Sequence, residues 1–274
     1  MNILISTTTN WNCGDEFIRI GVKNILKHIY PKANYIHYDR NPNNMIDYPS
    51  DQNIKTGLHG AFMNNPIDWS IVDLVVLAGS PEFLHEPLMP IYEGLADNIQ
   101  IPLWVIGVGY SYPEFIKPLS LNEKTVLSRN NTIIISRQEE LSNRLSLKLN
   151  KHIYTLPCPA LFCFENFPVK TNKDYNGVHS IEELKDGLFF SSDPYDMLYY
   201  IGSCEKVVSD RLHAVVAGIS SGAYSKLQND TFRCVEAIKL FSCVLESNKS
   251  KIEKFKIETF NNYIKIIKNE TLKK

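Results

Sequence analysis

The stretch KVVSDRLHAVVAGISSG at residues 206–222 decides how the chain is expected to fold. An apolar start, a polar turn and a run of small apolar residues are typical of a buried strand, a tight turn and a closely packed helix. Ser209 or Asp210 is expected to cap that helix. Arg211 and His213 would then lie at the helix N-terminus, where free N–H groups and the helix dipole favour an anion. The pattern suits a phosphorylated or carboxylated ligand, but it also fits an ordinary strand–helix junction in which these two side chains pair with a carboxylate and a carbonyl.

The same strand–turn–helix order opens the chain. Residues 2–6 predict a short apolar strand, and residues 16–30 place apolar side chains at helical spacing. Asp15 would lie in the first turn of that helix, and Gly14 allows another group to approach the backbone closely. The turn lacks a G-x-G-x-x-G pattern, so a dinucleotide site is not supported.

Further strands alternate with helices along the first half of the chain. Strands are expected at 33–38, 72–78, 101–108, 132–136 and 152–157, and helices at 90–98, 121–129 and 138–147. This order predicts an α/β protein whose parallel sheet is covered by helices on both faces. Ligands of such sheets bind beyond the carboxyl ends of the strands. The polar residues expected to share one site at these ends are Asp15, Ser80, Arg137, Arg211 and His213.

The second half begins with a polar segment at 165–183, interpreted as a linker, and continues with a strand at 187–191 and a helix at 194–203. After Gly222 the chain is polar, and a further helix is expected at 231–245. The predicted domains are an N-terminal lobe at 1–164, a reduced C-terminal lobe at 165–248 and a terminal helix at 249–274.

Composition excludes several classes of protein. The 274 residues carry a formal net charge of −1, which gives no indication of a nucleic-acid binder. No apolar run is long enough to span a membrane, and the first residues do not form a signal peptide. The six cysteines form no C-x-x-C pair and the histidines show no metal-ligand spacing, so no metal or cofactor is expected. Reduced thiols favour a cytoplasmic protein.

The terminal segment at 249–274 is rich in lysine and predicts an amphipathic helix. A basic amphipathic helix can lie on an anionic membrane, which would place the protein at the inner face of that membrane. The favoured alternative is a helix that packs its apolar side on the protein and keeps its lysines in water.

Six segments together carry a resemblance to a known family. They are NCGDEFIRIGV, VDLVVLAGS, IPLWVIGVGY, IIISRQEE, LPCPALF and VVSDRLHAVVAGISSG, in this order over most of residues 1–222. In these segments the chain resembles the polysaccharide pyruvyl transferases. The resemblance implies a two-lobed GT-B-like fold with Rossmann-like parallel sheets. The segment between CPALF and RLHA is short for the family, which implies that the C-terminal lobe is reduced.

The resemblance also implies an activity and a set of residues. Family members move the enolpyruvyl part of phosphoenolpyruvate onto a sugar of a cell-surface polysaccharide or of its lipid-linked precursor, usually leaving a pyruvate ketal. His213 would be the general acid, Arg211 and Arg137 would hold phosphate and carboxylate, and Asp15 would be the base or contact the acceptor. Further substrate contacts are expected at Asn12, Ser80, Leu212 and Lys226. Lys226 is an uncertain counterpart of the family lysine, because the strand that normally precedes it is expected to be missing.

Two other functions remain open from the sequence. One is a GT-B-like glycosyltransferase that uses a nucleotide sugar, which would need a diphosphate site and a carboxylate for the ribose. The other is a catalytically silent family member that binds a glycan. Stabilisation by phosphoenolpyruvate but not by nucleotide sugars would distinguish a pyruvyl transferase from the glycosyltransferase. Phosphate release that requires an acceptor would distinguish it from the silent glycan-binding protein.

Overall fold

Strands that alternate with helices build a six-stranded sheet in the order β2-β1-β3-β4-β5-β6, in which every pairing is parallel. The computed structural model describes residues 1–7, 13–39, 67–79, 88–110, 119–165, 178–179, 193–228 and 231–272. The strands of this sheet are β1 (Asn2–Thr7), β2 (Asn34–Asp39), β3 (Leu74–Ala78), β4 (Leu103–Val108), β5 (Thr132–Ser136) and β6 (Tyr154–Thr155). The predicted α/β class with Rossmann-like parallel strands is confirmed.

Helices cover both faces of the sheet, which explains why β3, β4 and β5 are buried along their whole length and largely apolar. The helices α3 (Met89–Asp97), α4 (Leu121–Leu127) and α5 (Glu139–Leu149) pack on one face. Helix α1 (Cys13–Ile29) packs on the other. The 3₁₀ turn η3 (Trp69–Ile71) leads into β3.

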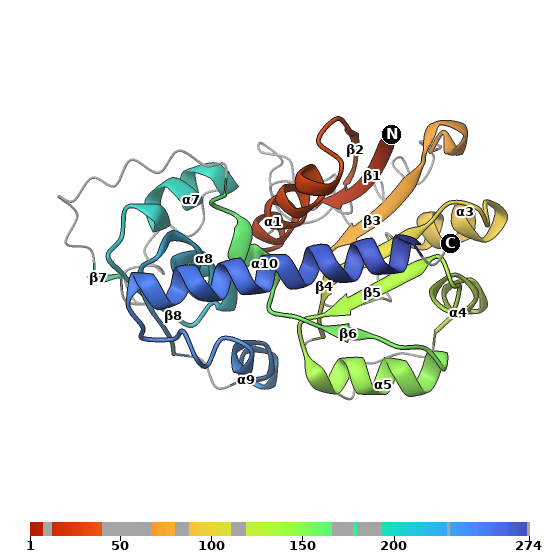
Figure 1. Cartoon of the computed structure of the whole chain (residues 1–274). Helices are drawn as coiled ribbons and strands as arrows, with labels where there is room; N and C mark the ends of the chain where they lie inside the picture. The colour runs from red at the N-terminus through yellow and green to blue at the C-terminus, as the bar shows by residue number, and fades with distance from the viewer. Residues whose placement is uncertain are drawn as a thin grey trace, which may run out of the picture.

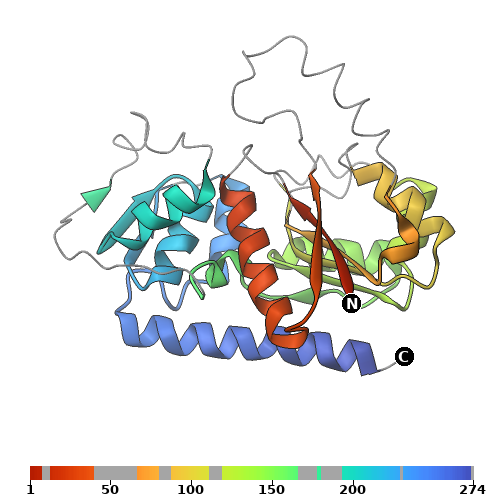
Figure 2. The ribbon, with the colours of Figure 1, turned by 90° about the horizontal axis from the view of Figure 1, so that it is seen from above.

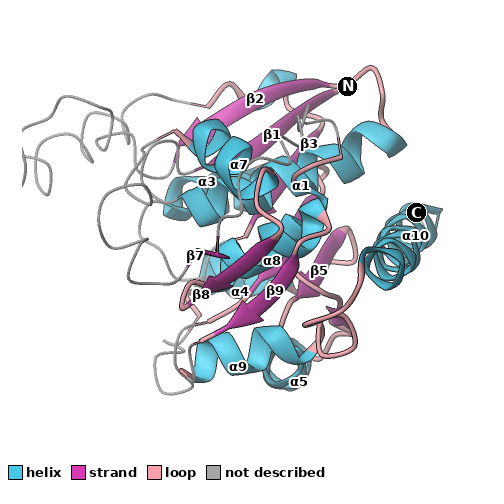
Figure 3. Cartoon of the chain, turned by 90° about the vertical axis from the view of Figure 1, so that its left-hand side faces the viewer, coloured by secondary structure: helices cyan, strands magenta, loops and turns pink. Residues whose placement is uncertain are grey.

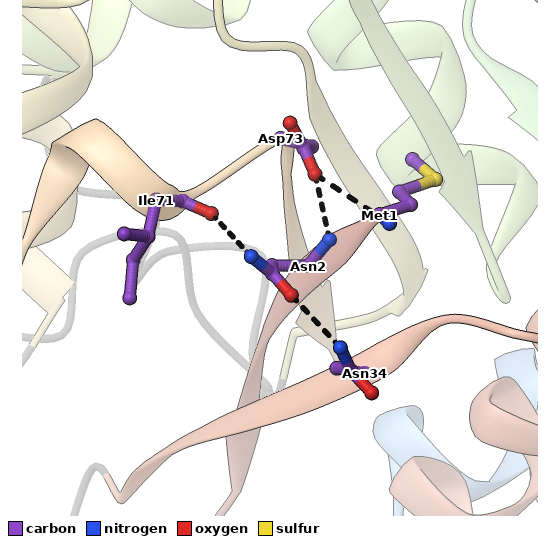
Figure 4. A network of polar contacts seen from close by, with 5 residues as sticks. All are labelled: Met1, Asn2, Asn34, Ile71 and Asp73. Atoms are coloured by element: carbon purple, nitrogen blue, oxygen red, sulfur yellow. Dashed lines mark hydrogen bonds and ion pairs between the residues drawn. The ribbon is translucent and has the colours of Figure 1, made fainter.

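A polar network ties the amino ends of β1, β2 and β3 together (Figure 4). The backbone N–H of Asn2 donates to Asp73 at 2.7 Å, and the Asn2 side chain donates to the Ile71 carbonyl at 2.9 Å. Asn34 donates to the Asn2 side chain at 3.2 Å. These bonds hold the register of the three strands at the edge opposite the carboxyl ends, where ligands of parallel sheets bind.

A second, three-stranded parallel sheet has the order β7-β8-β9 (Figure 3). It consists of β7 (Val178–His179), β8 (Lys206–Ser209) and β9 (Tyr224–Leu227), with α7 (Pro194–Gly202), α8 (Leu212–Ser221) and α9 (Phe232–Lys239). Two expectations were wrong. A strand does follow Gly222, because the polar YSKL segment pairs along β8, and β7 lies inside the predicted linker. The strand predicted at 187–191 lies outside the described residues.

Helix α10 (Lys249–Leu272) runs from the second sheet to the first (Figure 1). Near its start Lys256 donates to the Ser220 carbonyl at the end of α8, at 2.9 Å. In its middle Tyr263 donates to the Pro157 carbonyl at 2.8 Å, and near its end Glu270 accepts from Tyr154 at 2.6 Å. Its apolar side is packed on the protein, as the favoured alternative expected. No described helix combines the length and the hydropathy that crossing a bilayer requires.

Helix α1 lies between the two halves of the molecule (Figure 2). It packs on the six-stranded sheet and also contacts α7, α8, α10 and the 3₁₀ turn η6 (Pro159–Phe162). One continuous hydrophobic cluster therefore includes Ile3 and Ile135 of the first sheet, Val215 of α8 and Ile267 of α10. The proposed domain boundaries at 164 and 248 thus divide a chain whose two lobes share a core.

Candidate functional site

The candidate site forms where the carboxyl end of β5 meets the first turn of α8. Nη1 of Arg137, directly after β5, lies 2.6 Å from Nε2 of His213, the second residue of α8. Arg137 is 0% exposed and His213 is 7% exposed. The two predicted site residues, 76 positions apart in the chain, are therefore in direct contact.

The contact defines which ring nitrogen carries the proton. A guanidinium only donates, so Nε2 of His213 must accept and the proton of the neutral ring is assigned to Nδ1. We therefore assign a neutral imidazole to His213 in the ligand-free protein.

The local structure at the end of β5 holds Arg137 in place. Its backbone N–H continues the ladder by donating to the Val108 carbonyl at 2.9 Å. Gln138 brackets Tyr110 by accepting from its N–H at 2.7 Å and donating to its carbonyl at 3.2 Å. A Cβ at Gly109 would lie 2.6 Å from Nε of Arg137, so only glycine leaves room for this side chain.

Several buried polar atoms at the site lack partners. Among the described residues, Nε and Nη2 of Arg137 and Oδ1 of Asp15 have no hydrogen-bond partner. Nη1 of Arg137 contacts two groups, the ring of His213 and, at 3.8 Å, the sulfur of Cys158. Neither group supplies a negative charge to balance the guanidinium. A buried cation without a carboxylate is energetically costly, and buried polar atoms are normally satisfied. An anion at this position would supply both the charge and the acceptors.

Three helices begin around this position. Burial raises the pKa of the Cys13 thiol, at the start of α1, to about 11. The negative charge of Asp193, the N-cap of α7, adds to that rise, and the positive charge of Arg211, the N-cap of α8, opposes it. The N-termini of α1 and α8 meet at Gly14 and His213, and each favours an anion, whereas the N-terminus of α7 is already capped by the carboxylate of Asp193.

The start of α8 differs by one or two residues from the expectation. Arg211, not Ser209 or Asp210, is the N-cap, with extended φ and ψ of −93° and 115°. Oγ of Ser209 instead accepts from the Arg211 N–H at 3.0 Å, so this hydroxyl stabilises the turn before the helix. Arg211 is exposed, whereas Arg137 is buried, so the two guanidinium groups lie at different depths.

The other predicted site residues are distributed as follows. Asp15 is 6% exposed in the first turn of α1, as expected. Leu212 is buried in the hydrophobic core, so its side chain packs against apolar neighbours. Lys226 lies on β9 with a half-exposed side chain, 4.0 Å from Glu246. Asn12 and Ser80 lie outside the described residues.

Sequence reasoning did not identify Gly109, Cys158 or Asp193 as neighbours of the site. Their positions in the sequence could have indicated them, since Gly109 directly follows an expected strand and Cys158 lies within LPCPALF. Within the described part of the chain, no group of three or more His, Cys, Asp or Glu residues could hold a metal ion.

With this geometry established, comparison with known proteins assigns the family. The profile of the family described as polysaccharide pyruvyl transferase matches residues 12–224, which include Asp15, Arg137, Arg211 and His213. The chain belongs to the polysaccharide pyruvyl transferase family. Membership indicates pyruvyl transferase activity in general, and with it a transferase and a polysaccharide acceptor.

Two further comparisons were made for this polysaccharide pyruvyl transferase family member. A search of curated proteins found no match. Among solved structures, the crystal structure of a functionally uncharacterised protein from Klebsiella pneumoniae is similar with a TM-score of 0.49 and 13% identity, covering 90% of this chain and 91% of that one. So distant a likeness says nothing about function.

Proposed function

We propose that the protein transfers the enolpyruvyl group of phosphoenolpyruvate to hydroxyls of a sugar in a cell-surface polysaccharide or its lipid-linked precursor. The observation that supports this donor is the buried Arg137, which contacts His213 and has no carboxylate partner among the described residues. A small acid that carries both a carboxylate and a phosphate suits a site with one buried guanidinium, one exposed guanidinium and the N-termini of α1 and α8.

The residues take the following roles. His213 gives a proton to the methylene carbon of phosphoenolpyruvate, which leaves a cation-like centre at the carbon that bears the phosphate. A sugar hydroxyl adds to that carbon and loses its proton to Asp15. A second hydroxyl then replaces the phosphate and its proton leaves with that phosphate, so one donor and one diol give one ketal and one hydrogen phosphate. Arg137 and Arg211 offset the negative charge of the donor without reorganising.

We place this reaction in the cytoplasm, where phosphoenolpyruvate and a lipid-linked acceptor at the inner face of the membrane are both accessible. Contact of α10 with anionic lipids is proposed as electrostatic only. Its exposed lysines, Lys251, Lys254, Lys265 and Lys268, are available for it, whereas its apolar side is packed on the protein.

Thermal unfolding with and without ligand tests the donor. We expect phosphoenolpyruvate to raise the Tm and a nucleotide sugar to leave it unchanged, because only a ligand of the folded state stabilises it. Arg137→Gln and His213→Gln should abolish the shift. The matched controls are Arg144→Gln, at an exposed side chain of α5 that pairs with Glu140, and His152→Gln, whose ring packs on Tyr154 of β6. A shift with the nucleotide sugar alone would favour the glycosyltransferase instead.

Phosphate release tests the transfer itself. With phosphoenolpyruvate and a mixture of bacterial lipid-linked glycans, release should require the glycan and should be lost in His213→Gln. Binding of phosphoenolpyruvate or glycan without release in any mixture would indicate the silent glycan-binding alternative.

A further inference from the structure

The imidazole of His213 rests against the first turn of α1 at Gly14. A Cβ on residue 14 would lie 2.9 Å from both Cβ and Cγ of His213 and closer still to Nδ1. Real Cβ atoms do not approach other atoms so closely, so the ring occupies the space that a side chain at residue 14 would take. We propose that Gly14 is a positioning residue that holds His213 in contact with Arg137; this inference rests on the proposed role of His213 in proton transfer.

The ring is confined on two opposite sides. Gly14 borders Nδ1, and Arg137 contacts Nε2 at 2.6 Å. Helix α1 and the end of β5, both in the N-terminal lobe, therefore hold the His213 side chain, which α8 of the C-terminal lobe carries. Position and tautomer are therefore set together. A ring that turned or moved away from α1 would lose the alignment of Nε2 with the guanidinium.

Helix α8 cannot move away to make room for a side chain at residue 14. At its other end, a Cβ on Gly218 would lie 2.6 Å from Oγ of Ser225 and 2.9 Å from Cβ of Val207, so α8 already lies as close to β8 and β9 as the backbone allows. Nδ1 and Cγ of the imidazole can shift by rotation of the ring, whereas Cβ of His213, at 2.9 Å, moves only with the backbone. Substitution at Gly14 should thus displace the ring while the fold is retained.

The effect of Gly14→Ala on helix propensity is opposite in sign to the effect of a clash with His213, so the two can be told apart. Alanine is a better helix former than glycine, so Gly14→Ala should favour α1 unless the new methyl group meets His213. Gly94→Ala is the matched control, because a Cβ there would overlap the indole of Trp69 on the far face of the sheet, away from the site. A merely structural clash would behave alike in both variants.

The experiment records ¹⁵N spectra of the histidine side chains in the full chain without ligand. The protein has 7 histidines, and the signals of His213 are assigned by their loss in His213→Gln. We expect the Nδ1–H tautomer for His213 in the wild type and in Gly94→Ala, and changed ring shifts or a changed tautomer in Gly14→Ala. Unchanged His213 signals in Gly14→Ala, or equal changes in Gly94→Ala, overturn the proposal.

A second measurement covers the case in which Gly14→Ala does not fold. Removing the whole side chain should remove the clash, so Gly14→Ala should lower the Tm of the wild type but not that of His213→Gly. Equal losses in both backgrounds overturn the proposal. Neither measurement needs a donor, so failure of phosphoenolpyruvate to bind would remove the proposed function and leave the positioning of the ring decided independently. With a donor and acceptor, Gly14→Ala should lower kcat at least tenfold and change KM less than threefold.

Discussion

Nη1 of Arg137 and Nε2 of His213 lie 2.6 Å apart and join the carboxyl end of the six-stranded sheet to the first turn of α8. Arg137, which would bind the donor, thus donates a hydrogen bond to Nε2 of His213, the nitrogen that would protonate the donor. A donor that draws the guanidinium to itself would free Nε2. Donor binding by Arg137 and protonation of Nε2 of His213 are therefore coupled through one contact.

The first prediction concerns protons. Because Nε2 of His213 accepts from Arg137 in the ligand-free protein, an anion that draws the guanidinium to itself should free Nε2 to take up a proton. Calorimetry with sulfate at pH 7 in buffers of different ionisation enthalpy measures that uptake. Sulfate does not titrate near neutrality, so uptake that disappears in His213→Gln belongs to the ring. Binding of sulfate without uptake would contradict the coupling.

The second prediction concerns the shape of the cation. Arg137→Lys keeps the charge but loses the planar fork and cannot reach the same acceptors. We expect kcat to fall by roughly a hundredfold, the scale found when one preorganised donor is removed. Arg144→Lys, on an exposed turn of α5 where the side chain pairs with Glu140, is the control and should change the rate less than twofold. Equal effects in both variants would argue against a specific role for Arg137.

The third prediction concerns alkaline stability. Burial raises the pKa of the Cys163 thiol from its ordinary 9.0 to about 12 and places the pKa of Tyr263 well above its ordinary 10.0. Above pH 9 for Cys163, and above pH 10 for Tyr263, the unfolded chain loses a proton that the folded protein keeps, so the free energy of unfolding should fall by about 1.4 kcal/mol per pH unit for each group.

Urea unfolding at pH 8, 9 and 10 under reducing conditions measures this effect. Cys163→Ala should make the decline shallower, whereas Cys243→Ala, at an exposed thiol, should leave its slope unchanged. A decline that is the same in both variants would place its origin elsewhere.

The fourth prediction concerns α10. Tyr263→Phe removes the hydroxyl that donates to the Pro157 carbonyl at 2.8 Å and leaves that carbonyl without its partner. The expected loss is about 1–3 kcal/mol of unfolding free energy. Tyr154→Phe removes the part-buried bond to Glu270 and should cost less, because water can replace it. Denaturant midpoints of the two variants decide the order.

Much of the first sheet could be predicted because its strands are long apolar runs. The expected strand at 132–136 coincides with β5, since the β-branched run TIIIS favours a buried strand. The strand β9 was not predicted, because its YSKL segment has no apolar period and owes its pairing to the neighbouring β8. Such a strand is stabilised by tertiary contacts that a local pattern does not contain.

The candidate site was predictable in its members but not in its contacts. Residues at the ends of parallel strands must gather at one edge, which is why Arg137 and His213 could be expected near each other. Direct contact depends on the packing of one lobe against the other. The same holds for Gly14: the sequence indicated a close approach there, but the approaching group comes from a helix about two hundred residues later in the chain.

The hydrophobic cluster that includes α1, α8 and α10 also has a consequence for biosynthesis. While the ribosome is still translating residues 249–272, Phe162 lacks the rings of Phe260 and Tyr263 of α10, which pack edge-on against it in the folded protein. The nascent protein should thus depend on chaperones until its last helix emerges, and stalled or prematurely terminated chains should aggregate rather than accumulate as half-molecules.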